Sequence, residues 1–152
     1  MDEMRNVGVT PVETILGYDG LGFLKAIIDG TLPKAPISAL LGFDIVDAEP
    51  GKAVFEGLPE FRHYNPIGTV HGGLAMTLLD SCMSCAVQTT LAKGELYTTL
   101  ELKVNLTRAI TKDTVLCARP GGSFIAAAPP APRKATSAMA PATCSRTAPR
   151  RA

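Results

Sequence analysis

The chain has 152 residues, a formal net charge of +1 and 46% hydrophobic residues, which suits one globular domain with a single core. No uncharged apolar run reaches the ~18 residues of a membrane span, and the acidic first residues lack the pattern of a signal peptide. Four cysteines without a secretory signal favour reduced thiols, so we expect a cytoplasmic protein without membrane contact.

The charged residues are unevenly distributed along the chain. Residues 1–119 carry all 14 acidic residues against ten basic ones, whereas residues 120–152 carry five basic residues and no acidic one. The second segment also holds ten Ala and six Pro, with neither a helical nor a strand period. We therefore divide the chain into a domain at 1–119 and an atypical Ala/Pro-rich basic tail at 120–152.

Two explanations fit this tail. Its composition is typical of a disordered segment. Alternatively it is translated from a shifted reading frame, because the codons of residues 120–134 permit a strand, a basic turn and the start of another strand in the neighbouring frame. An intact frame through codon 152 in the source gene would exclude the shift. A basic tail can also bind nucleic acid, but we expect no nucleic-acid partner here.

Hydrophobic patterns before the tail predict a helix, a hairpin and a second, longer helix. Residues 20–29 have helical spacing and are followed by Gly30 and Pro33. Residues 37–49 and 51–58 flank Pro50-Gly51 and predict a hairpin, and residues 59–70 predict a loop. Residues 72–91 are apolar on nearly all sides, which predicts a buried helix.

The segment after this helix carries the clearest strand pattern in the chain. Apolar and polar residues alternate strictly over residues 96–106, and residues 113–118 predict a further strand. The whole order fits an α+β fold, in which a long antiparallel sheet curls around one central helix.

The start of the long helix resembles a reaction site. Asp80 is a lone acid in an apolar helix, which costs folding free energy unless the carboxylate is used. Gly72 and Gly73 begin the helix, so their N–H groups lack intrahelical partners and suit a carbonyl oxygen that gains negative charge. Ser84 follows Asp80 by one turn on the same face and is placed to hold a water molecule.

Asp80 and Gly72 are too far apart on one helix to serve the same carbonyl. Eight residues separate them, which is ~12 Å along an α-helix. If two subunits pack these helices antiparallel, Asp80 meets the partner's Gly72. We therefore expect a homodimer with two shared sites.

This combination of groups suits hydrolysis of a thioester. A thiol of pKa ~8.5 leaves as a thiolate with little help, so no dedicated general acid is needed. A carboxylate that acts as base or nucleophile and an oxyanion hole then suffice. We expect this reaction to need neither a metal nor a cofactor.

Three motifs, NPIGTVHGG, LLDS and TTLELKVN, resemble those of the hotdog-fold acyl-CoA thioesterases of the phenylacetate-pathway and 4-hydroxybenzoyl-CoA type. The resemblance covers residues 20–117 and implies a sheet wrapped around the helix at 72–91, with dimers that often pair into homotetramers. It implies that Asp80 is the catalytic carboxylate, that the Gly72 N–H polarises the carbonyl of an acyl-CoA or aryl-CoA, and that Asn65 and His71 shape the pocket. Ser84 stands where the family often has a hydroxyl that orients water.

The resemblance also sets expectations for selectivity and for the sheet. We expect Gly73, Met76 and Met83 to contact the substrate, because pocket depth depends on this part of the helix. Family members usually continue past Arg119 with two further strands, so we expect the last strands to be disrupted in this chain.

Structural explanations exist for each of these residues. Asp80 could cap or pair inside the helix, His71 could bond to the loop backbone, Asn65 could form an Asx turn and Ser84 could be a small packing residue. These alternatives stay open at this point.

Cys82 and Cys85 have CxxC spacing, but their place in an apolar helix favours packing over a redox or metal site. We expect His63 at the surface of the loop. Two other functions also remain: a hotdog hydratase or dehydratase with a catalytic His paired to an acid, and a non-catalytic acyl-CoA binding module that would not need Asp80.

Overall fold

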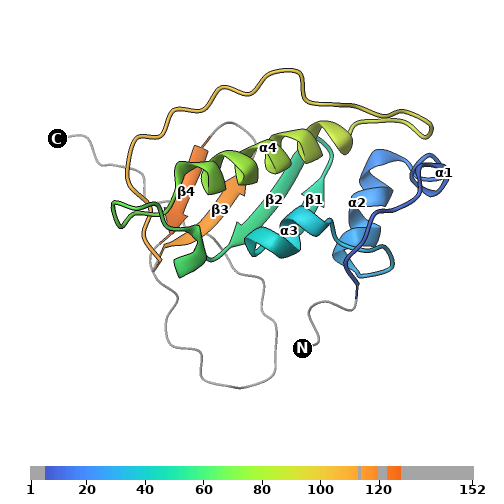
Figure 1. The fold of residues 1–152 in the computed structure, drawn as a ribbon. Coiled ribbons are helices and arrows are strands. Elements are labelled where there is room, and N and C mark those ends of the chain that lie inside the picture. Colours follow the sequence, from blue (N-terminus) through green and yellow to red (C-terminus); the bar gives the residue numbers. More distant parts are fainter. Residues whose placement is uncertain (1–5, 113, 120–122, 128–152) are drawn as a thin grey trace.

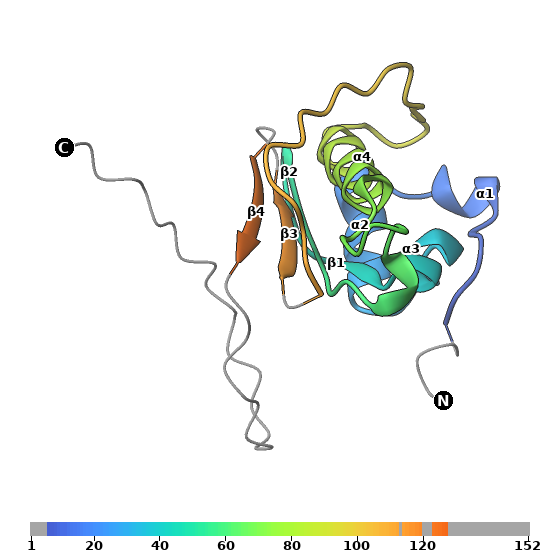
Figure 2. The ribbon, with the colours of Figure 1, turned by 60° about the vertical axis from the view of Figure 1, so that its left-hand side comes forward.

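The computed structural model describes residues 6–112, 114–119 and 123–127. Its elements, in chain order, are α1 (Val12–Ile15), α2 (Gly20–Ile28), α3 (Pro36–Leu41), β1 (Phe43–Glu49), β2 (Lys52–Gly57), the 3₁₀ turn η1 (Phe61–His63), α4 (Gly72–Gln88), β3 (Val115–Arg119) and β4 (Ser123–Ala127). The four strands form one sheet in the order β1-β2-β3-β4, and each neighbouring pair is antiparallel. The helices lie on one face of this sheet (Figures 1 and 2). No helix in these ranges is long and apolar enough to cross a membrane.

The predicted hairpin is present as β1 and β2, joined at Pro50-Gly51. Gly51 has φ +74°, a left-handed conformation that glycine adopts without strain, and the ladder runs from Glu49↔Lys52 to Phe43↔Gly57. The expectation that the first strand begins at residue 37 is wrong, because residues 36–41 form α3. Pro36 occupies the first turn of that helix and Gly42 ends it in a left-handed conformation.

Helix α2 confirms the helix predicted at residues 20–29. The Asp19 carboxylate caps its start by accepting the Gly22 N–H at 2.6 Å. Gly20 lies directly against the end of α4, where a Cβ atom would overlap the carbonyl oxygen of Gln88. The Gly20 N–H also donates to the Leu91 carbonyl at 3.0 Å, so α2 and α4 are joined at this point.

Helix α4 packs one face on the sheet. Its buried apolar side chains are Leu74, Ala75, Leu78, Leu79, Cys82 and Ala86, and they form the core with Phe43, Phe55 and Leu116. The expectation of a helix buried on all sides is only partly met, since Met76 is 41% exposed on the opposite face. The fold is nevertheless the predicted α+β arrangement of an antiparallel sheet on one long helix (Figure 2).

Residues 96–106 are not a strand, which corrects the clearest strand prediction. They run extended along the side of α4 that faces away from the sheet (Figures 1 and 2) and make no backbone hydrogen bond with the described part of the chain. The alternation survives only in part: Leu102 and Val104 are half-buried, whereas Leu100 is 95% exposed. A period of two sets where side chains point, but a strand also needs a neighbouring strand, and none is present along this segment within those ranges.

The strand predicted at residues 113–118 is confirmed as β3, shifted by one or two residues. Beyond Arg119 the sheet continues for one more strand, because β4 pairs with β3 from Val115↔Ala127 to Arg119↔Ser123. Residues 128–152, and with them most of the proposed frame-shifted tail, lie outside the described residues.

Candidate active site

Asp80 lies half-buried on α4, on the side next to the extended segment. Its Oδ1 accepts hydrogen bonds from the Ser84 hydroxyl at 3.3 Å and from the Thr99 hydroxyl at 3.0 Å. The two hydroxyl oxygens are 3.1 Å apart, so the three groups form a closed triangle. The i, i+4 spacing places Ser84 there, whereas Thr99 comes from the segment beyond the helix.

The triangle leaves one carboxylate oxygen open. Both hydrogen bonds go to Oδ1, and Oδ2 accepts none from the residues that the structure describes. A carboxylate with one oxygen held by hydroxyl donors and the other open has a fixed direction in which to accept a proton. The sequence prediction missed Thr99, and the only available signal was its polar position in the alternating segment.

A groove of about 810 Å³ opens at this carboxylate. It lies between α2 and α4, and we name it the α2–α4 groove. Asp80, Ser84 and Thr99 line it together with other residues of α4 and of the extended segment, and α2, residues 8–10, Ile15, residues 33–38, β1 and β2 contribute further lining residues.

A thiol and a phenol, those of Cys85 and Tyr97, also line the same groove. Burial raises the pKa of the Cys85 thiol to about 12, and burial likewise raises the pKa of the Tyr97 hydroxyl to about 12. Both groups therefore keep their protons at neutral pH, and Cys85 is not a thiolate nucleophile. Cys82 packs in the core and its Sγ donates to the Ala53 carbonyl at 3.3 Å, in accord with the packing interpretation of the CxxC spacing.

The start of α4 presents one open amide rather than two. The Gly73 N–H donates to Nδ1 of His71 at 2.9 Å, and the Leu74 N–H donates to the His71 carbonyl at 3.1 Å. Within the described ranges the Gly72 N–H has no acceptor. The expectation of two open glycine amides is therefore corrected, because the side chain of His71 caps the helix and occupies the second.

Glycine at position 72 leaves room for a side chain of the region that follows α4. A Cβ atom there would lie 2.6 Å from Cδ1 of Leu106, so the leucine packs on the bare Cα.

Asn65 holds the loop that leads to α4. Its Oδ1 accepts the N–H groups of Ile67 at 3.1 Å and Thr69 at 3.2 Å, and its Nδ2 donates to the Thr69 hydroxyl at 2.8 Å. These bonds form the Asx-type turn that was the structural alternative for this residue. Asn65 therefore acts on the shape of residues 65–69 and does not contact Asp80.

The prediction of a surface position for His63 is wrong, because this side chain is only 7% exposed. Its Nδ1 accepts the Glu60 N–H at 2.8 Å, and its carbonyl accepts the His71 N–H at 2.7 Å. His63 thus ties the loop to the residue that caps α4. A single polar residue in a predicted loop carries no sequence pattern that indicates burial.

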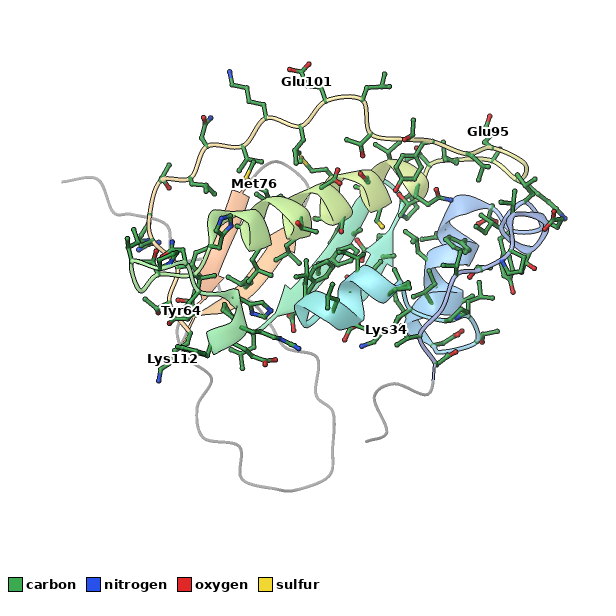
Figure 3. All side chains as sticks on the ribbon, viewed as in Figure 1. Lys34, Tyr64, Met76, Glu95, Glu101 and Lys112 are labelled. Atoms are coloured by element: carbon green, nitrogen blue, oxygen red, sulfur yellow. The ribbon has the colours of Figure 1, made fainter. Side chains whose placement is uncertain are left out.

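The structure does not bring all predicted site residues together within one chain. Asp80 and Ser84 line the α2–α4 groove, whereas His71 and Gly72 lie at the start of α4 and Asn65 lies in the loop before it, outside the groove lining. None of the three residues expected to contact the substrate lines this groove: Gly73 is the second residue of α4, Met76 is exposed and Met83 lines a second cavity of about 320 Å³ next to residues 103–110. Figure 3 shows Met76 on α4 beneath the extended segment, and Glu101 on that segment pointing away from α4.

Comparisons with known proteins agree with the motifs. Residues 67–120 match the sequence family described as the thioesterase superfamily. Acyl-coenzyme A thioesterase 13 of Homo sapiens is 37% identical over 65 residues, which are 42% of this chain and 46% of that protein. The chain thus spans about half the length of the curated relative it matches.

Two solved structures share the fold. The phenylacetic acid degradation protein PaaI from Thermus thermophilus superposes with a TM-score of 0.51 at 27% identity, over 55% of this chain and 70% of that one. A phenylacetic acid degradation-related protein from Ralstonia eutropha has a TM-score of 0.58 at 24% identity, over 64% and 74% of the two chains.

Proposed function

We propose that this chain, a member of the hotdog thioesterase family, hydrolyses the thioester bond of an acyl-CoA or aryl-CoA to a free acid and CoA. The observation that carries the proposal is the carboxylate of Asp80 in the lining of a mostly apolar groove, with one oxygen held by two hydroxyl groups. The relatives named above include a thioesterase of acyl-coenzyme A and a protein of phenylacetic acid degradation, which agrees with this substrate class.

Asp80 acts in one of two ways. As a general base, its open Oδ2 takes a proton from a water molecule, and that water attacks the thioester carbon. As a nucleophile, the carboxylate attacks the carbon itself and forms an anhydride, which water then hydrolyses. In both cases the C–S bond breaks and CoA leaves as a thiolate, which needs little protonation because a thiol has a pKa of ~8.5.

Thr99 and Ser84 position the carboxylate in this scheme. Their hydroxyls donate to the same oxygen, which fixes the rotation of the carboxylate and leaves the other oxygen open. A fixed base loses less entropy when the transition state forms.

The oxyanion donor comes from a second copy of the chain. The open Gly72 N–H is the group best suited to the developing negative charge, but Asp80 is eight residues away on the same helix. An antiparallel pair of α4 helices would place Asp80 next to the partner's Gly72, which gives a homodimer with two shared sites. Pairing of such dimers would give the homotetramer. His71 and Asn65 support the donor by capping α4 and shaping the loop.

The other two functions receive less support from the contacts. A hydratase would use a histidine paired with an acid, but Nδ1 of His71 is occupied by the Gly73 N–H, and no acidic side chain within the described ranges bonds to this ring. A binding module would not need a carboxylate held at the groove by two hydroxyls.

Thiol release from a panel of acyl- and aryl-CoA esters tests the proposal. The wild type, Asp80→Asn and Asp80→Ala are compared with Glu101→Gln, which removes a carboxylate from an exposed position on the extended segment. We expect turnover to fall by ~10²-fold or more in both Asp80 variants and to stay unchanged in Glu101→Gln. Folded wild-type protein that releases no thiol from any ester, yet binds acyl-CoA, would instead support the binding module.

A further inference from the structure

We propose that the α2–α4 groove binds the acyl group of the thioester, and that it selects uncharged, apolar acyl groups over those that end in a carboxylate. This inference rests on the proposed hydrolysis at Asp80. The groove volume of about 810 Å³ lies within the ~300–1,000 Å³ that is usual for small-molecule sites.

The walls of the groove are apolar. Helix α2 contributes Phe23, Leu24, Ile27 and Ile28, and the sheet contributes Ile45 and Phe55. An amphipathic helix normally buries its apolar stripe in the protein core. Here Leu24 is buried, but Ile28 stays 37% exposed at the groove, so apolar surface is left for a ligand to cover.

The groups proposed for the reaction are held together at the groove. Asp80, Ser84 and Thr99 line it and are bonded to one another, and apolar side chains of α2 line it as well. A thioester whose carbonyl carbon lies next to Asp80 can therefore extend its acyl group between α2 and α4. Transfer of each buried methylene from water to these walls favours binding.

The charges along the groove disfavour a second carboxylate on the acyl group. Among the described lining residues, the charged ones are Lys34, Asp44 and Asp80. The single cation is already paired, because Nζ of Lys34 donates to both oxygens of Asp44 at 3.0 and 3.2 Å. An acyl group that ends in a carboxylate would lose its water and gain no cation in return. Figure 3 shows this lysine beside α3.

Binding of thioether analogues tests the groove without relying on turnover. S-butyl-CoA and S-octyl-CoA cannot be hydrolysed, and an S-alkyl-CoA of octyl length with a terminal carboxylate is their charged match. By isothermal titration calorimetry we expect affinity to rise by up to about fourfold per methylene, hence by tenfold or more from butyl to octyl. We expect the carboxylate-ended ligand to bind at least about tenfold more weakly than S-octyl-CoA.

Two lysine substitutions test whether the dependence of affinity on chain length and terminal charge arises in the groove. Ile28→Lys places an unpaired cation in the groove, whereas Leu40→Lys places one on α3 at a position that is 64% exposed and outside the groove. Ile28→Lys should remove most of the gain from butyl to octyl and improve binding of the carboxylate-ended ligand. Leu40→Lys should change neither. If the lysine variant does not fold, Ile28→Trp fills the groove without a charge and should weaken the octyl ligand more than the butyl one.

Each outcome decides the proposal. Equal affinity for butyl and octyl ligands, or equal effects of the two lysine variants, would overturn the groove as the acyl site. Length-dependent binding that Ile28→Lys abolishes would support it. If octanoyl-CoA is then bound but never hydrolysed, the groove stands and the proposed hydrolysis fails.

Discussion

The loop before α4 and the extended segment after it contribute to the same candidate site, yet they are held in different ways. In residues 63–71 the side chain of Asn65 makes three hydrogen bonds and the backbone of His63 bonds to His71. Residues 96–106 make no backbone hydrogen bond with the described part of the chain, and Thr99 is their hydroxyl contact with Asp80. The loop therefore has several of its partners within its own nine residues and is also bonded to Ile110 and Lys112 through Val70 and Tyr64. The segment, in contrast, depends on side-chain contacts with groups distant in sequence.

The groups at Gly72 and at Asp80, on α4, are therefore held by different kinds of contact. The proposed oxyanion donor, the Gly72 N–H, lies beside residues that are held by local hydrogen bonds, and preorganised donors of this kind need no rearrangement during a reaction. The carboxylate at Asp80 is oriented across a gap in sequence, so its geometry depends on where the segment lies. Four predictions test this difference between the loop and the extended segment.

The largest effect is expected at Gly72. Proline is favoured in the first turn of a helix, and the preceding residue, His71, has φ −62° and ψ 130°, which suits a position before proline. Gly72→Pro should lower kcat in the thiol-release assay by ~10²-fold or more relative to Gly72→Ala, because only proline removes the N–H. Both variants are made with Leu106→Ala, which clears the space that a Cβ needs.

Mixing subunits extends this test to the shared site. Asp80→Asn and Gly72→Pro chains, each inactive alone, should regain roughly a quarter of wild-type activity when they form mixed dimers at random. Equal turnover of the proline and alanine variants, or no recovery on mixing, would contradict the assignment of the donor to the partner's Gly72.

The next effect is expected at Thr99. Thr99→Val keeps the shape of the side chain but removes the hydroxyl that donates to Asp80 at 3.0 Å. A hydrogen bond to a charged group contributes ~1.5–3 kcal/mol, so kcat should fall about 10–100-fold with little change in KM. Thr99→Ser should restore most of kcat. A valine variant as active as the serine variant would mean that the segment does not orient the carboxylate.

Substitution of one asparagine in each segment compares how much the two segments contribute to stability. Asn65→Ala removes three hydrogen bonds and should lower the free energy of unfolding by ~1–3 kcal/mol. Asn105→Ala, at an exposed position of the extended region, should change it by less than ~0.5 kcal/mol. Urea denaturation measures both. Equal losses would show that the segment is as firmly held in solution as the loop.

The smallest effect concerns pH. Burial lowers the pKa of His63, and the nearby charge of Arg62 lowers it further against an opposing effect of Glu60. The folded state thus binds fewer protons than the unfolded chain, whose histidine has a pKa of ~6.5. The contribution of His63 is therefore complete above about pH 6.5 and is lost as pH falls through its lower folded pKa. Between pH 7.5 and pH 5 the free energy of unfolding, measured by urea denaturation, should fall less in His63→Gln than in the wild type. Equal decreases in the two proteins would contradict this role.

Local patterns predicted the elements whose partners are near in sequence. The spacing in residues 20–29 gave α2, Pro50-Gly51 gave the hairpin, and the glycines after His71 gave the start of α4. The strand predicted at 96–106 was wrong because alternation alone does not specify a hydrogen-bonded neighbour. The start of β1 was wrong because Pro36 and Gly42 frame a short helix that interrupts the strand pattern.

For the candidate site, too, the residues that depend on local sequence were predicted and those that depend on distant segments were missed. Asp80 stood out because a carboxylate in an apolar helix is unusual, and Ser84 followed from helical spacing. Thr99 and the burial of His63 were missed because both depend on segments that fold back onto the site from elsewhere in the chain. The hydrogen bond from the Gly73 N–H to the His71 ring was missed because it depends on the orientation of that ring, which the spacing of residues does not specify.

The close contact at Gly20 has a consequence for how substrate range can change. Gly20 does not line the α2–α4 groove, yet any side chain there would collide with the backbone of Gln88 and push α2 outward. The spacing of the two backbones at this contact thus contributes to the width of the groove. A single substitution at position 20 is therefore expected to widen the proposed acyl site, and so to change the size of acyl group that fits, without replacing any lining residue.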